Sequence, residues 1–349
     1  MPSARPLAFA PVAASGRPRP FAQPSAPSSA SPSASPSASP ADADRAALLS
    51  GLCAPVASIA PKFFYDTLGS ALFDAITELD EYYPTRTERA IFSAHDAEIA
   101  AAFGRTNCTL VDLGAGNGEK AARLFPVLRP REYVAIDISV EYLQRSLEAL
   151  QRRFPHIAMT GVGADLGRPL ELPARLPREG RLFFYPGSSI GNLVPDEALR
   201  FLQGLRAHLD DTGALLVGID LAKDVATLEA AYDDPLGVTA AFNLNVLRHA
   251  NRIAGTDFVL ADWRHVAFFD ATHARIEMHL EARRAVRVRW PGGERRFAAG
   301  ERIHTEHSHK YRIDEFAALL ARAGFAVQGR WTDEREWFAV VLARPGPHR

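Results

Sequence analysis

A short glycine-rich segment, residues 114–118, is the first part of the chain whose residue types could bind a reactive small molecule. Its sequence, GAGNG, follows the apolar run Thr109–Leu113, so we expect a tight turn after a buried strand. Glycine suits such a turn because it tolerates positive φ and lets a ligand lie against the backbone. Asp112 precedes the turn, and Asp137 ends the next apolar run, where a carboxylate can accept hydrogen bonds from both hydroxyls of a ribose. The pattern predicts a nucleoside site.

The spacing of the glycines distinguishes between two classes of nucleoside ligand. A dinucleotide site uses G-x-G-x-x-G, and in this chain the position of the third glycine is Glu119, an acid that would repel a pyrophosphate at the opening of a helix. The observed G-x-G-x-G, with an acid before it and another after the next strand, is typical of sites for S-adenosylmethionine, which carries a sulfonium and an ammonium. Asp165 follows the apolar run 156–162. In α/β folds that bind S-adenosylmethionine, a side chain at this place commonly hydrogen-bonds the adenine amino group. A glycine turn without a ligand is the alternative.

A sheet of parallel strands is expected to position these side chains. Apolar strand-like runs alternate with helical segments in the middle of the chain, which is the signature of a doubly wound α/β fold. The expected strands are residues 109–113, 133–136, 156–162, 181–185 and 214–219, and the expected helices are residues 119–128, 140–152 and 196–209. After a helical region at 225–255, alternating runs predict antiparallel strands at residues 258–269, 275–290, 301–311 and 327–342.

The first 42 residues differ in composition from the rest of the chain. They consist mainly of Pro, Ser and Ala, and such a segment cannot bury enough apolar surface to offset the entropy of ordering, so we expect disorder. A targeting peptide is the alternative, because Arg5, Arg17 and Arg19 precede the first acid. Ordered structure is expected from residues 42–44, with helices at 46–52, 72–79 and 87–103.

The overall composition restricts the class of partner. The 349 residues are 47% hydrophobic, and 40 Lys and Arg against 41 Asp and Glu give a formal net charge of −1. This balance argues against nucleic acid or an anionic membrane surface as a partner and favours a small-molecule substrate. Cys53 and Cys108 have no metal-ligand spacing and indicate a reducing compartment. Since no apolar stretch reaches the roughly 20 residues of a membrane span, we expect a soluble protein. We also expect it to be cytoplasmic and monomeric.

Several dispersed segments together resemble one enzyme family. They are residues 61–74 (PKFFYDTLGSALFD), 81–88 (EYYPTRTE), 110–120, 184–193 (FYPGSSIGNL), 220–224, 231–246, 275–278 and 305–308. In this order and spacing they are similar to the histidine Nα-methyltransferases of ergothioneine biosynthesis, which convert histidine to Nα,Nα,Nα-trimethylhistidine (hercynine). The resemblance extends over residues 45–343, and residues 1–42 have no counterpart in it.

The resemblance implies a fold and a division into domains. The fold is α/β, a Rossmann-like (class I) S-adenosylmethionine-dependent methyltransferase with a second, smaller α+β domain that binds the substrate. We expect a disordered Ala/Pro/Ser-rich tail at 1–42, the N-terminal helical part of the substrate domain at 43–85, the Rossmann-like domain at 86–222, the inserted substrate-binding domain at 223–312, and a return to the Rossmann-like domain at 313–349. The substrate would lie in the cleft between the two domains.

The resemblance also implies how histidine is held. Asn192 and Tyr232 would bind the α-carboxylate, Tyr82 would lie near the amino group, and Glu306 and Ser308 would hydrogen-bond the imidazole. Physical chemistry favours the role of Glu306 and Ser308, because side chains two residues apart on a strand share a face. A carboxylate and a hydroxyl on one face can hydrogen-bond the two nitrogens of an imidazole. A neutral amide and a phenol can also hold a carboxylate without a competing cation.

The remaining implied site residues line the pocket or contact the methyl donor. Gly187 and Met278 would help line the substrate pocket. The methyl donor would be contacted by Tyr65, Gly114, Lys120, Asp137, Asp165 and Leu166. The reaction would be an in-line displacement by the amine nitrogen, aided by alignment of the reacting atoms, with Tyr65 and Tyr82 as the catalytic groups that could relay the proton.

Other interpretations of the same residues stay open. Asn192 could simply cap a helix. His304, His307 and His309 could suggest a metal site, but they lack paired ligand spacing; methyl transfer needs no metal, so we expect none, and alternation points His307 away from the pocket. The same fold could methylate the amino group of another amino acid or of a histidine derivative. From other classes, a nicotinamide-dependent oxidoreductase lacks its third glycine here, and the complete pocket argues against a binding module without turnover.

Overall fold

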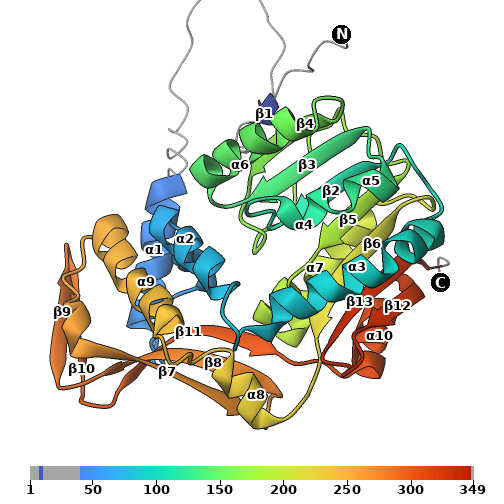
Figure 1. The fold of residues 1–349 in the computed structure, drawn as a ribbon. Helices are drawn as coiled ribbons and strands as arrows, with labels where there is room; N and C mark the ends of the chain where they lie inside the picture. Colours follow the sequence, from blue (N-terminus) through green and yellow to red (C-terminus); the bar gives the residue numbers. More distant parts are fainter. Residues whose placement is uncertain (1–7, 11–39, 347–349) are drawn as a thin grey trace, which may run out of the picture.

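The computed structural model describes residues 8–10 and 40–346 of the chain (Figure 1). Its main element is an eight-stranded sheet with the order β1-β4-β3-β2-β5-β6-β13-β12. The strands from β1 to β6 run parallel, and β13 is antiparallel to both of its neighbours. Their bounds are β1 Ala8–Ala10, β2 Thr109–Leu113, β3 Glu132–Asp137, β4 Ala158–Gly163, β5 Arg181–Tyr185, β6 Ala214–Asp220, β12 Phe325–Thr332 and β13 Phe338–Pro345. The predicted α/β, Rossmann-like fold is confirmed.

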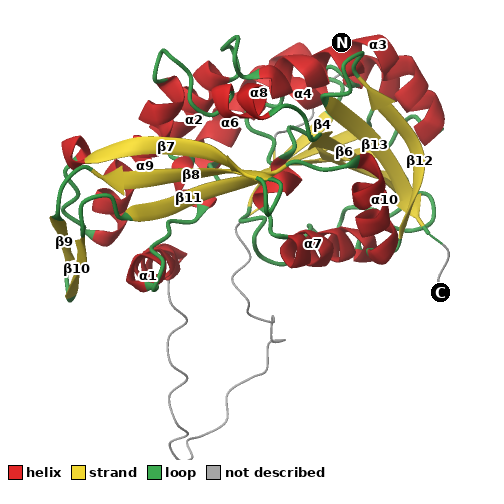
Figure 2. Cartoon of the chain, turned by 90° about the horizontal axis from the view of Figure 1, so that it is seen from below, coloured by secondary structure: helices red, strands yellow, loops and turns green. Residues whose placement is uncertain are grey.

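Helices cover both faces of this sheet, which explains why its central strands are continuous apolar runs. Every residue of β2, β5 and β6 is buried, as expected for parallel strands packed on both sides. One face packs against α3 (Tyr83–Phe103), α4 (Glu119–Ala122), α5 (Phe125–Leu128) and α6 (Val140–Arg153), and the other against α7 (Pro195–Ala207) and α10 (Ile313–Arg322). Figure 2 shows α7 and α10 on one side of the sheet and α3 on the other.

A second, smaller hydrophobic unit is formed by segments distant in the sequence. It contains a three-stranded antiparallel sheet with the order β11-β8-β7 and a hairpin of β9 and β10 (Figure 2). Its apolar cluster joins N-terminal residues such as Phe64 to inserted residues such as Phe242, whose rings stack at 4.5 Å. Its elements are α1 Pro40–Cys53, η1 Pro61–Phe64, α2 Thr67–Ile76, α8 Val225–Ala230, α9 Val238–Ala254, η3 Leu260–Asp262, β7 Trp263–Asp270, β8 Arg275–Ala282, β9 Val286–Trp290, β10 Gly293–Phe297 and β11 Arg302–His309.

Short-range chemistry explains where several of these helices begin. Asp66 precedes α2 and accepts a hydrogen bond from the Gly69 N–H at 2.7 Å, and Asp224 precedes α8 and accepts one from Thr227 N–H at 2.8 Å. Each such cap stabilises a helix by about 1 kcal/mol. The predicted helix 119–128 is instead divided into α4 and α5, because Pro126 lacks the N–H that a continuous helix needs at that point.

Three further expectations need correction. Ala8–Ala10, inside the expected disordered tail, forms β1 and pairs with β4; residues 1–7 and 11–39, the rest of that prediction, lie outside the described part of the chain. α1 begins at Pro40 rather than at residues 42–44. The long alternating runs 275–290 and 327–342 are each two strands, since the turns between β8 and β9 and between β12 and β13 interrupt them.

The parallel strands end at one edge of the sheet, and this edge carries the predicted chemistry. Residues 114–118 follow β2, Asp137 ends β3, Asp165 follows β4, Gly187 follows β5 and Asp220 ends β6. Ligands of open α/β sheets bind outside the carboxyl ends of the strands. Among the described residues, the structure has no helix that is long and apolar enough to cross a membrane.

Candidate active site

The glycine turn holds the carboxylate of Asp137 in a fixed place. Gly114, Gly116 and Gly118 have φ of 71°, 54° and 71°, values that residues with a Cβ rarely adopt. A Cβ added at Gly114 or Gly116 would meet no atom within 4 Å, so the turn faces open space, whereas at Gly118 it would lie 2.5 Å from Leu150 Cδ1. The turn donates the Gly116 N–H to Asp137 at 2.9 Å. An open glycine surface beside a fixed carboxylate fits the ribose end of a nucleoside.

Two lysines connect the predicted donor site to other parts of the chain. Lys62 of η1 donates to Asp165 at 3.0 Å and to Asp44 at 2.8 Å, which ties the N-terminal segment to the loop after β4. Leu166 packs against the apolar cluster behind that loop. Lys120 donates to Glu88 at 2.7 Å.

Glu88 is a functional candidate that the sequence analysis missed. Its side chain is 1% exposed, and besides Lys120 it accepts the Gly187 N–H at 2.7 Å. The buried carboxylate thus couples the helix after the glycine turn to the strand end that borders the pocket. Its place within segment 81–88, one of those that resemble the enzyme family, was the available signal, but only the fold shows what it contacts.

A cavity between the two hydrophobic units brings the predicted substrate residues together. It is bordered by Phe73, Ile76, Ser188, Ser189, Ala231, Thr239 and Phe242, which the sequence analysis did not name. It is also bordered by eight predicted site residues, Tyr65, Tyr82, Gly187, Asn192, Tyr232, Met278, Glu306 and Ser308. These eight come from six separate segments of the chain, so a shared cavity is not a consequence of their spacing.

Four polar side chains of this cavity form two hydrogen-bonded pairs. Asn192 Nδ2 donates to Glu306 Oε2 at 3.3 Å, and the Tyr232 hydroxyl donates to Ser308 Oγ at 2.9 Å. Glu306 and Ser308 share one face of β11, while a register shift between His304 and Glu306 sets that face. Burial raises the pKa of Glu306 to about 7. The site therefore presents a carboxylate, an amide and two hydroxyls to a small polar ligand.

Comparison with known proteins now assigns the family. Residues 44–345 match the model of the family described as histidine-specific methyltransferase, SAM-dependent. The chain belongs to this family. The methyltransferase is 43% identical over 310 residues to histidine N-alpha-methyltransferase of Mycolicibacterium smegmatis, covering 87% of this chain and 95% of that protein. It is 42% identical over 306 residues to the protein of that name from Mycobacterium tuberculosis, covering 86% of this chain and 94% of that one.

A third relative is a longer protein. Ergothioneine biosynthesis protein 1 of Neurospora crassa is 33% identical over 290 residues, which are 80% of this chain and 32% of that protein. The family match confirms the resemblance seen in the dispersed sequence segments. S-adenosylmethionine is accordingly the methyl donor of this methyltransferase.

The two predicted catalytic tyrosines lie among other aromatic rings, Tyr82 buried and Tyr65 partly buried. Tyr82 packs edge-on against Phe73 and Tyr232, with ring centroids 6.2 Å apart in both pairs, and Tyr65 contacts Phe73 and Phe242. Burial raises the pKa of both phenols well above its usual value, so each remains protonated at neutral pH. The rings and hydroxyl oxygens suit a cationic amine, whereas neither phenol is available as an anionic base.

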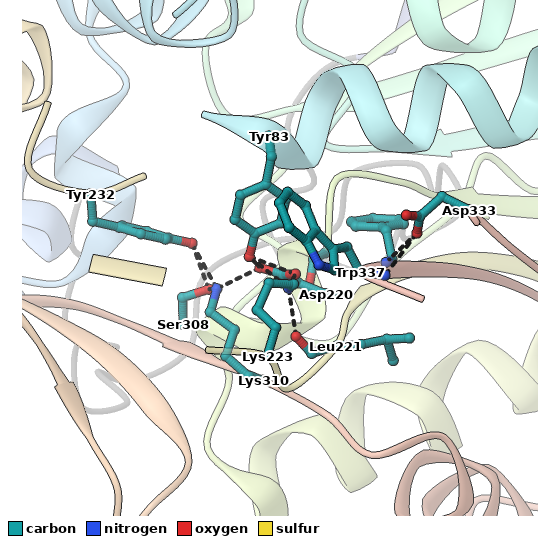
Figure 3. Close-up of polar contacts among 11 residues, drawn as sticks. Tyr83, Asp220, Leu221, Lys223, Tyr232, Ser308, Lys310, Asp333 and Trp337 are labelled. Carbon is teal, nitrogen blue, oxygen red and sulfur yellow. Dashed lines mark hydrogen bonds and ion pairs between the residues drawn. The ribbon is translucent and has the colours of Figure 1, made fainter. Parts of the chain in front are cut away.

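A buried ionic network lies directly behind the predicted substrate residues Tyr232 and Ser308 (Figure 3). Lys310 donates to Asp220 at 2.8 Å, to Ser308 at 2.9 Å and to the Tyr232 hydroxyl at 3.0 Å. The expectation that Tyr232 would act without a nearby cation is wrong, since this ammonium contacts its hydroxyl. Neither Lys310 nor Asp220 was singled out from the sequence, because an isolated lysine or aspartate carries no signal of burial.

The histidines of β8 and β11 form a row of ring contacts on another surface. His304 stacks on His307 at 5.6 Å, and His307 contacts His309 at 5.2 Å; none of them borders the cavity. Within residues 8–10 and 40–346, no group of three or more His, Cys, Asp or Glu side chains is arranged to hold a metal ion.

Proposed function

We propose that this methyltransferase transfers methyl groups from S-adenosylmethionine to the α-amino nitrogen of L-histidine, up to Nα,Nα,Nα-trimethylhistidine (hercynine), as the first step of ergothioneine biosynthesis. The observation that carries the proposal is the single cavity shared by Tyr65, Tyr82, Asn192, Tyr232 and the Glu306–Ser308 pair. The histidine-specific family and the names of the two mycobacterial relatives support the same substrate.

Substrate recognition follows from the chemistry of the paired groups. We assign the imidazole to Glu306 and Ser308, and the α-carboxylate to Asn192 and Tyr232. All four groups border one cavity and are hydrogen-bonded in pairs at 3.3 and 2.9 Å, and a bound histidine would take the place of these hydrogen bonds. Holding both ends of the substrate fixes the nitrogen between them, and such orientation supplies much of the rate enhancement in a reaction that needs alignment.

The donor side of the site is assigned to the glycine turn and the strand ends around it. S-adenosylmethionine supplies an electrophilic methyl group on a sulfonium. Asp137 would accept hydrogen bonds from the ribose hydroxyls and Asp165 from the adenine amino group, with Gly114 and Leu166 lining the nucleoside. Lys120 lies 2.7 Å from Glu88 and would contact the donor from the cavity side.

The amine must be neutral to attack, and the chain must direct its proton away. Tyr65 and Tyr82 remain phenols, so each can accept a hydrogen bond from the amine through an oxygen lone pair, but it can take up the proton only while it passes its own proton onward to water. We assign them to holding and relaying this proton rather than to removing it as anions. Their rings would also stabilise the cation that grows with each methyl transfer.

The remaining assignments are part of the same proposal. We propose the domain division 43–85, 86–222, 223–312 and 313–349, with the cavity between the two hydrophobic units as the reaction site. We also propose that the enzyme is a cytoplasmic monomer that works without a metal. Light scattering of the purified protein checks that it is a monomer, and activity in excess chelator checks that it needs no metal.

The direct experiment is to incubate the purified protein with S-adenosylmethionine and single amino acids and to record product masses. We expect gains of one, two and three methyl groups on L-histidine. Methylation of another amino acid or of a histidine derivative, with histidine unchanged, would overturn the proposed substrate while leaving the family assignment intact.

A further inference from the structure

The ionic network behind the cavity contains a lysine whose contacts all lead to functional groups. Lys310 follows β11, and its side chain has no exposed surface. A lysine ammonium has three N–H donors and no acceptor. In Lys310 one donor reaches Asp220, and the other two reach the hydroxyls of Tyr232 and Ser308, both of which border the cavity (Figure 3).

Two lysines of this network share one carboxylate. Asp220 is 1% exposed and is shared by Lys310 and Lys223, and it also accepts hydrogen bonds from the Tyr83 hydroxyl. Burial alone would raise the pKa of Asp220, but the two lysines hold it below its usual value, so it is an anion. Burial lowers the pKa of Lys223 to about 8, which leaves it mostly cationic at neutral pH. Asp333 is a further acid whose charge acts on Lys223, whereas Lys310 hydrogen-bonds to the shared Asp220 and to two hydroxyls.

A buried ammonium that shares its carboxylate with a second lysine is stabilised by any further negative charge nearby. The carboxyl of Glu306 is close enough to be influenced by Lys310, but its pKa of about 7 leaves it only partly ionised near neutral pH. An α-carboxylate placed against Tyr232 would bring a full negative charge close to the Lys310 ammonium.

We propose that Lys310 is a positioning residue whose ammonium commits the Tyr232 and Ser308 hydroxyls to donating toward the substrate, and whose charge selects substrates that carry a free α-carboxylate. This inference rests on the proposed function, because it places the carboxylate of histidine at Tyr232. The ammonium occupies one lone pair of each hydroxyl oxygen, so neither hydroxyl can donate to it. A phenol polarised in this way is a stronger donor to an anion, since hydrogen bonds within a low-dielectric network reinforce one another.

Lys223 provides a matched comparison within the same network. It contacts Asp220, the Tyr83 hydroxyl and the Leu221 carbonyl, and Figure 3 shows it on the side of Asp220 away from Tyr232. Replacing either lysine leaves Asp220 with one ammonium and the Tyr83 hydroxyl. The two variants thus make a similar change in buried charge, but only the change at Lys310 removes contacts to the cavity.

The test compares L-histidine with L-histidinamide, which keeps the imidazole and the amine but lacks the carboxylate. kcat/KM is measured for both with wild type, Lys310→Met and Lys223→Met. We expect wild type to prefer histidine, Lys310→Met to lose about 10–100-fold of that preference, and Lys223→Met to retain most of it. Binding of S-adenosylhomocysteine, which uses the other side of the site, confirms that each variant is folded.

The preference for histidine over histidinamide in the Lys310 variants distinguishes a positioning role from a purely structural one. An equal loss for both substrates in Lys310→Met would show a purely structural lysine and would overturn the inference. If that variant does not fold, Lys310→Gln, which keeps part of the donor function, should show an intermediate preference; an unchanged preference would equally refute the selection by charge. A wild-type enzyme that methylates neither compound would instead refute the proposed function, so the two failures are distinguishable.

Discussion

Replacing Glu306 separates recognition of histidine from binding of the methyl donor. The carboxylate is 7% exposed, borders the substrate cavity, and accepts a hydrogen bond from Asn192 at 3.3 Å. In the proposed complex it accepts the N–H of the imidazole. Glu306→Ala removes that acceptor, and Glu306→Gln keeps an oxygen of similar position but removes the charge.

The size of the effect follows from the charge and burial of this group. A hydrogen bond to a charged group contributes about 1.5–3 kcal/mol, which corresponds to roughly 10–150-fold in affinity. We therefore expect Glu306→Ala to weaken histidine binding by about that factor at pH 8, and Glu306→Gln to have a smaller effect. S-adenosylhomocysteine should bind to both variants as it does to wild type.

The raised pKa of Glu306 adds a signature in pH. Burial places its pKa at about 7, so the free enzyme gains a proton on this carboxyl as pH falls from 8 to 6. A protonated carboxyl is uncharged and accepts only a weaker hydrogen bond from the ring N–H, so histidine binds more weakly as pH falls through this range. Glu306→Gln cannot titrate, and its histidine affinity should lose this component of the pH dependence.

Calorimetric titration of histidine into the complex with S-adenosylhomocysteine measures both effects without turnover. Glu277→Gln is the control, because Glu277 lies on the neighbouring strand β8, contacts Arg275 and His279, and does not border the cavity. It should leave histidine affinity unchanged. Equal losses of histidine and S-adenosylhomocysteine affinity in Glu306→Ala would refute the assignment of this residue to the imidazole.

Three further outcomes are expected. Asp137→Asn should weaken S-adenosylhomocysteine binding by about 10-fold or more, because one charged acceptor for the ribose is lost; unchanged calorimetric affinity would place the ribose elsewhere. Gly118→Ala should lower the Tm by about 2–10 °C, since its Cβ would lie 2.5 Å from Leu150 at a φ of 71°. Gly204→Ala is its control, because that Cβ meets no atom within 4 Å, and a similar fall there would contradict the steric argument. Tyr82→Phe should reduce kcat for histidine while donor affinity stays the same, as measured by stopped assays and titration; an unchanged kcat would exclude the hydroxyl from the proton relay.

Local regularities made much of the fold and part of the site predictable. Alternation of strands and helices indicated the parallel sheet, and the order of the glycine turn and Asp137 indicated a nucleoside ligand, because both depend on residues close in the sequence. The spacing of Glu306 and Ser308 on one strand predicted a shared face for the same reason. Element boundaries were less predictable, as the division at Pro126 shows.

The network around Lys310 was decided only by the tertiary structure. Tyr83, Asp220, Tyr232 and Lys310 are up to 227 residues apart, yet each hydrogen bond among them is 3.0 Å or shorter. The sequence indicated the type of cofactor and predicted which residues would address a histidine, because those signals lie in short motifs. Which cation stands behind a neutral phenol depends on how distant segments pack, since burial and contact are properties of the assembled chain rather than of any single stretch of it.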